Sequence, residues 1–196
     1  MKIFYEIQSF LEETYGAKTG LDVRDFIRPV AGLDNLGQLW VDQTQNGDLD
    51  VAVLLDRDIL AAWEKPQDLS PRALSVSFEE ISHFVYLAYN HERKRNITRL
   101  ELEAQSEVDR ILLAFHKTHE AHPHGGENLL NELVAIPYSD QAGSTYEEAR
   151  ELASKFIRNL SGGDPRTWTP TEFEILRKFF HSDLSEKIHL ARGKKL

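Results

Sequence analysis

The chain contains no cysteine, so disulfide bonds, thiolate metal sites and cysteine nucleophiles are excluded. No apolar run approaches the roughly 20 residues that a membrane-spanning helix needs. The N-terminal segment also lacks the long apolar core of a signal peptide. Neither a phosphate-binding glycine loop nor a nucleophile motif is present. We therefore expect a cytoplasmic protein with no part in a membrane.

Positive charge is also scarce, with 23 Lys and Arg against 32 Asp and Glu and a net charge of −9. Such an acidic chain disfavours binding to nucleic acids and to anionic membranes. Its 196 residues, 41% of them hydrophobic, are ordinary for a globular protein with a real core. The expected partner is therefore another protein, and the composition leaves the oligomeric state open.

Hydrophobic patterning predicts an α+β fold that is mostly helical. Two β-prone runs flank Asn46-Gly47, a dipeptide typical of tight turns, and predict a small antiparallel sheet with a hairpin at about 38–55. Apolar residues three and four apart predict a central helix pair at about 78–92 and 99–117. Because a lone hairpin is marginally stable in water, we expect these helices to cover it.

Other elements are expected on either side of the central pair. Residues 3–14 predict an amphipathic first helix, and residues 26–28 a short strand that ends or lies at an edge at Pro29. Asp56 is expected to cap a short helix. Helices are predicted at 144–160, after Thr169-Pro170, and at about 184–191.

Three regions follow from this pattern. Residues 1–118 are expected to form an α+β core domain, and 119–143 a linker region containing His and Gly. Residues 144–196 are expected to form a C-terminal helical segment packed on the core. The linker begins within a group of four histidines, His116, His119, His122 and His124. Histidine is the commonest transition-metal ligand, but the irregular spacing here favours an exposed loop.

The central helix pair carries the one compact group of acid–base or metal-binding candidates, namely Glu79, Glu80, His83, Glu103 and Glu107. Residues three or four apart are neighbours on a helix. Glu79 and Glu80 therefore lie within one turn of His83, and the two later glutamates share a face. If the helices pack antiparallel, His83 meets one of those two carboxylates.

A purely structural interpretation competes with a functional one. Ser77 with Glu80, and Thr98 with Glu101, have the spacing of capping boxes that would begin the two helices. In that case Glu80 serves as a cap. A carboxylate at position 79 would likewise be favoured in a first helical turn by the helix dipole.

Glu79-Glu80-Ile81-Ser82-His83 resembles the zincin metallopeptidase signature His-Glu-x-x-His, with Glu79 in place of the first histidine. The resemblance implies that Glu80 is a general base and that His83 and Glu79 are metal ligands. In the gluzincin branch a glutamate of the following helix completes the ligand set, which Glu103 or Glu107 would supply. The implied cofactor is a divalent metal such as zinc, or none if the incomplete set no longer binds one.

Two other chemistries fit parts of the same segment. Glu80 and His83 have the Glu-x-x-His spacing of di-iron carboxylate bundles, but a second copy of that motif is missing. A metal-free acid–base site using His83 and a carboxylate is the other possibility.

We expect a noncatalytic protein-interaction or adaptor protein on a degenerate zincin-like scaffold. Its apolar docking surface could come from the aromatic residues Trp168, Phe173, Phe179 and Phe180. The alternative is a divergent, peptidase-like metal-dependent hydrolase. In that protein Glu80 would activate water, and His83 would bind the metal together with glutamates.

Overall fold

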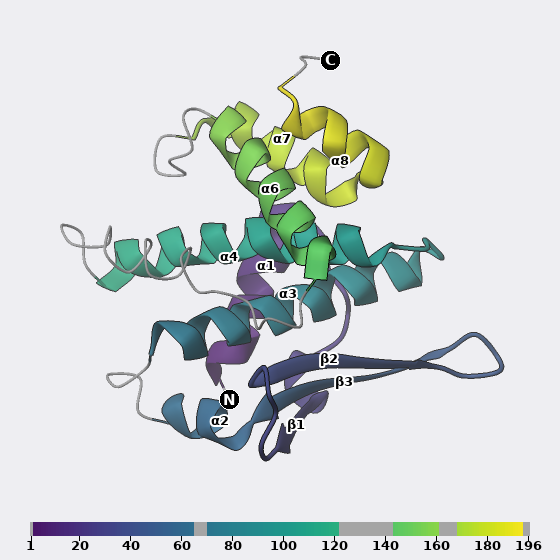
Figure 1. The fold of residues 1–196 in the computed structure, drawn as a ribbon, viewed down its shortest axis with the longest axis vertical. Helices are drawn as coiled ribbons and strands as arrows, with labels where there is room; N and C mark the ends of the chain where they lie inside the picture. The colour runs from purple at the N-terminus through teal and green to yellow at the C-terminus, as the bar shows by residue number, and fades with distance from the viewer. Residues whose placement is uncertain (1, 65–69, 122–142, 161–167, 194–196) are drawn as a thin grey trace.

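The computed structural model describes residues 2–64, 70–121, 143–160 and 168–193. Figure 1 shows two long helices, α3 (Pro71–Glu92) and α4 (Arg99–Ala121), crossing the middle of the molecule. A small sheet lies on one side of this pair, and α6 (Gly143–Asn159), α7 (Pro170–His181) and α8 (Leu184–Ala191) lie on the other. The fold is α+β and mostly helical, as predicted.

The sheet has three strands in the order β1-β3-β2. Strands β2 (Gly37–Gln43) and β3 (Leu49–Asp56) form the predicted antiparallel hairpin, and Gly47 takes a positive φ of 86° in its turn. Strand β1 (Ile27–Val30) pairs with β3 in parallel, so the sheet is mixed rather than purely antiparallel. The central strand β3 buries Val53 and Leu55 against the helices.

Helix α3 begins earlier than the sequence predicted. Its N-cap is Ser70, whose side chain accepts a hydrogen bond from the Ala73 N–H, and Pro71 occupies the first turn. The capping box predicted at Ser77 is therefore wrong. Ser77 lies inside the helix, where its hydroxyl accepts a hydrogen bond from Trp63 Nε1 at 2.8 Å. This frees Glu80 from the capping role.

Helix α4 begins as predicted, because Thr98 and Glu101 form a capping box. The helix continues to Ala121, past the expected end at 117 and across the boundary placed at residue 118. Most of the predicted linker, including His122, His124 and the segment 129–136, lies outside the described residues. The packing of α3 on α4 buries Ala104 and Val108.

The shorter elements follow the local signals. Helix α1 (Lys2–Tyr15) ends at Gly16, which has a φ of 62°. A single 3-10 turn (Val23–Asp25) leads into β1, and Asp56 caps α2 (Arg57–Ala62). Helix α7 begins after Thr169 as predicted, with a capping box formed by Thr169 and Glu172 and with Pro170 in its first turn, and α8 spans the expected residues. None of the described helices is long and apolar enough to cross a bilayer.

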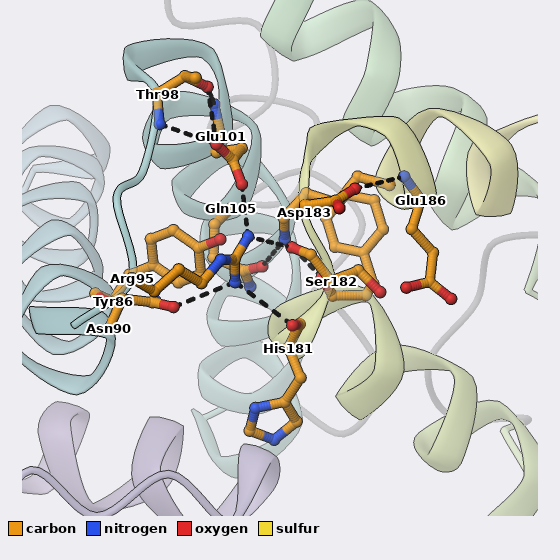
Figure 2. Close-up of polar contacts among 12 residues, drawn as sticks. Tyr86, Asn90, Arg95, Thr98, Glu101, Gln105, His181, Ser182, Asp183 and Glu186 are labelled. Atoms are coloured by element: carbon orange, nitrogen blue, oxygen red, sulfur yellow. Dashed lines mark hydrogen bonds and ion pairs between the residues drawn. The ribbon is translucent and has the colours of Figure 1, made fainter. Parts of the chain in front are cut away.

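Arg95 joins the α3–α4 connection to the C-terminal helices (Figure 2). Its guanidinium donates to the backbone carbonyls of His181 and Ser182, at 3.3 and 2.6 Å. It also pairs with Glu101 at 2.5 Å, which is the glutamate that caps α4. Arg95 thus lies where three helix ends meet.

The C-terminal aromatic residues belong to the core. Phe179 and Phe180 are fully buried, and Trp168 is 8% exposed. Phe179 stacks on Phe156 of α6, and Phe180 stacks on Tyr15 of α1. These side chains therefore do not form the apolar docking surface that the sequence suggested.

Candidate metal centre

The helix pair brings His83 against carboxylates from both of its helices. His83 is 5% exposed, and its Nε2 lies 3.2 Å from Glu103 Oε2 on α4. The other ring nitrogen, Nδ1, lies 3.6 Å from Glu80 Oε2, one turn back on α3. The imidazole is thus placed between two buried acids, each with a side chain no more than 7% exposed.

Glu79 completes a three-residue group. One ligand atom each from Glu79, His83 and Glu103 lie within 4.8 Å of one another. Glu107, the other glutamate suggested from the sequence, stands outside this group and pairs with Arg110 at 2.8 Å. The rotation of α4 therefore turns Glu103, and not Glu107, toward the histidine.

The carboxylates and the histidine change one another's protonation. Burial, followed by the charge of Glu80, raises the pKa of Glu79 to about 8. Burial alone would lower the pKa of His83, but Glu103 and Glu80 outweigh it and hold that pKa well above its usual range. Burial likewise opposes ionisation of Glu103, yet the close approach and charge of His83 lower the pKa of Glu103. At neutral pH the group therefore holds protons that a cation could displace.

The donor set fits a divalent cation. His83 Nε2 and Glu80 Oε2 are buried without a hydrogen bond of acceptable geometry, and buried polar atoms normally have a partner. The ligand atoms of a tetrahedral zinc ion lie about 3.4 Å apart, so the observed spread of up to 4.8 Å requires the side chains to close by about 1.4 Å. One imidazole with two carboxylates suits zinc, manganese or iron(II).

Three neighbours of this group could not be read from the sequence. Arg99 Nε lies 3.6 Å from Glu103 Oε1, and the Arg99 guanidinium donates to the Tyr146 hydroxyl of α6 at 3.3 Å. Gly37 of β2 lies so close to Glu80 that an added Cβ would be 2.9 Å from its Cγ. The candidate centre is thus enclosed by α6 on one side and by a strand on another.

A second buried polar cluster lies deeper in the core. Asp109 accepts hydrogen bonds from Tyr15, Ser82 and Gln105. The amine of Lys187, which is fully buried, donates to Gln105 Oε1 at 2.9 Å and to the Phe179 carbonyl at 2.5 Å. Burial raises the pKa of Asp109 to about 6 and lowers that of Lys187 well below its usual range. Because every member has partners, this cluster links α1, α3, α4 and α8 without offering a site.

The fold and the buried group together define a mostly helical α+β protein with a carboxylate–histidine centre between its two longest helices. Comparison of the chain with protein-family models, with curated proteins and with solved structures finds no match.

Proposed function

We propose that the protein binds a divalent cation through Glu79, His83 and Glu103 and acts as a metal-dependent hydrolase of the zincin-like type. The observation that carries the proposal is the convergence of three ligand atoms within 4.8 Å, from two helices, with His83 and Glu103 buried and Glu79 partly exposed. When bound, such a cation would polarise a carbonyl or phosphoryl oxygen and lower the pKa of water.

Glu80 has two possible roles in this site. The zincin resemblance implies a general base. The position of Glu80 against His83 Nδ1 also supports a positioning role, because an N–H···carboxylate contact there leaves Nε2 free to face the other ligands. Glu80→Gln separates the two roles. Loss of a positioning contact weakens metal affinity by about 10–100-fold, whereas loss of a base alone removes hydrolysis and leaves metal affinity unchanged.

Metal content is the direct test of the cation site. Protein purified without a histidine tag should contain about one equivalent of metal, or take it up after chelation, with a rise in melting temperature on adding zinc, manganese or iron(II). His83→Asn should abolish both effects. His91→Asn is the matched control, because His91 lies on the same helix and is exposed. Absence of stoichiometric metal, together with no thermal shift, would refute the proposal.

A noncatalytic interaction protein is the second candidate, and the burial of the ligands favours it. The side chains of His83 and Glu103 are each 6% exposed, as expected for a cation that only cross-links α3 to α4. Cobalt substitution distinguishes the candidates. A hydrolase leaves a coordination position open to a small anion such as azide, so the cobalt spectrum shifts on adding it, whereas a closed structural site gives no shift.

A further inference from the structure

The sheet has two edges, and they differ in how well they are protected. Strand β1 is short, and it carries Pro29, which has no N–H, and the exposed cation Arg28. Strand β2 forms the other edge with the sequence Gly-Gln-Leu-Trp-Val-Asp-Gln, which contains no proline and no basic residue. Of the residues that the structure describes, none pairs with its outer side. Such an edge is a template for another strand.

The outer half of β2 also exposes large apolar side chains. Trp40 is 44% exposed and Val41 is 42% exposed, on opposite faces of the sheet. Figure 1 shows the turn between β2 and β3 extending past the ends of the helices. Both faces around Trp40 and Val41 are therefore accessible together with the strand edge.

The hydrogen-bond pattern fixes which residues can accept a new strand. The Asp56 N–H donates to the Leu36 carbonyl at 2.8 Å, and the Thr44 N–H donates to the Asp48 carbonyl at 2.9 Å. In an antiparallel ladder, bonded positions recur at every second residue. The even-numbered residues of β2 thus bond to β3, and the odd-numbered residues direct their backbone groups outward.

We propose that β2 pairs with β2 of a second copy of this chain, antiparallel about a two-fold axis at Trp40. The two sheets then form one continuous sheet. This register pairs all seven residues and joins only odd with odd positions through hydrogen bonds, as the ladder requires. Shifted registers leave residues at the strand ends unpaired.

The side chains in this register are self-complementary. Trp40 stands opposite Trp40 of the second copy, and Leu39 stands opposite Val41. Asp42 stands opposite Gln38, so the two copies of Asp42 are not opposed. Aromatic and apolar cross-strand pairs each contribute about 0.2–1 kcal/mol relative to Ala pairs, whereas directly opposed like charges are destabilising. The self-pairing of the exposed apolar residues Trp40 and Val41, with no like charges opposed, favours a second copy of the same strand as the occupant.

Sedimentation of the full chain over a range of concentrations is the first test, and a dimer is expected. Val41→Pro removes an outward N–H that β3 does not use, and Val41→Lys places a charge against Leu39 of the second copy. Both variants should be monomers with unchanged circular dichroism. A wild-type monomer at all concentrations, or a dimer that both variants retain, would overturn the proposal.

Single cysteines test the register, because the natural chain has none. Under mild oxidation Trp40→Cys should form a disulfide-linked dimer, since facing positions of this kind have Cα atoms about 4.5 Å apart, within the range that a disulfide spans. Asp42→Cys is the matched control on the same face and is also exposed. Its two copies would lie about 14 Å apart, so it should not cross-link. Equal cross-linking of both variants would refute this register.

Discussion

Replacing Glu79 with glutamine should make the metal-free protein more stable at pH 8 and leave it nearly unchanged at pH 5. Burial and the neighbouring Glu80 raise the pKa of Glu79 from 4.5 to about 8. A carboxyl group whose pKa is raised by folding stabilises the fold fully below its unfolded pKa, and this contribution is lost as the pH rises through the folded value. The stability that the neutral Glu79 contributes is therefore lost between pH 4.5 and about 8. Glutamine is neutral throughout this window.

The size of this stability difference follows from the pKa shift of Glu79. At about 1.4 kcal/mol per pKa unit, a rise from 4.5 to about 8 sets an upper limit of about 5 kcal/mol. Glu79 remains partly exposed, so solvent reduces this value. We expect the Glu79→Gln variant to be more stable than the wild type by about 2–3 kcal/mol at pH 8.

Urea unfolding after chelation, repeated from pH 5 to pH 8.5 on the wild type and on Glu79→Gln, measures this difference. Glu13→Gln on α1 is an exposed control and should show no dependence of the difference on pH. Adding a cation should reverse the order at pH 8. The wild type gains stability because binding needs the ionised carboxylate, and the variant gains little.

Two results would refute this reasoning. Parallel pH profiles for the wild type and Glu79→Gln would mean that Glu79 is not held in its neutral form. Equal stabilisation of both proteins by the cation would mean that Glu79 is not a ligand, even if the pH profiles differ.

Three further substitutions test the packing around the helix pair. Arg95→Met should cost about 1–3 kcal/mol of unfolding free energy, because it removes the cation beside the buried carboxylate of Glu101, which keeps only its capping bonds from Thr98. Tyr15→Phe removes one hydrogen bond to the buried carboxyl group of Asp109 and should cost about 1–3 kcal/mol. Gly37→Ala forces a Cβ against α3, within 2.5 Å of its nearest atom, and should cost about 1–3 kcal/mol. Chemical denaturation measures all three.

Each of these substitutions has a clear contrary result. A surface ion pair such as Lys155 with Glu151 contributes less than about 1 kcal/mol, so Lys155→Met sets the scale for Arg95→Met. A cost no larger than that control would show that Arg95 does not hold the helix ends together. Unchanged stability of Tyr15→Phe would mean that the bond to Asp109 adds nothing net. Unchanged stability of Gly37→Ala would mean that β2 can move away from α3.

Local signals carried most of the fold prediction. Asn46-Gly47 predicted the hairpin and Thr98 with Glu101 predicted the start of α4, because each signal involves residues within a few positions of one another. The same kind of signal misled at Ser77, since a capping pattern also occurs by chance inside helices. The parallel pairing of β1 was missed because nothing near Ile27 in the sequence specifies its partner.

The candidate site was predictable only in part. Helical spacing placed Glu79 and Glu80 within one turn of His83, and the structure has this arrangement. The preference for Glu103 over Glu107 depends on the rotation of α4, which is set by packing across the whole helix pair. The proximity of Tyr146 depends on how α6 docks, and no short-range pattern encodes that.

The position of Glu101 has a consequence for how the protein unfolds. The carboxylate of Glu101 caps the N-terminus of α4 and also binds the guanidinium of Arg95. That guanidinium in turn donates to the Ser182 carbonyl at the C-terminal end of α7. Deleting the chain after α6 would therefore remove the two carbonyls that help hold Arg95 against Glu101, at the start of a helix far upstream. We infer that the last two helices cannot melt separately, and that calorimetry would record a single cooperative transition for the intact chain.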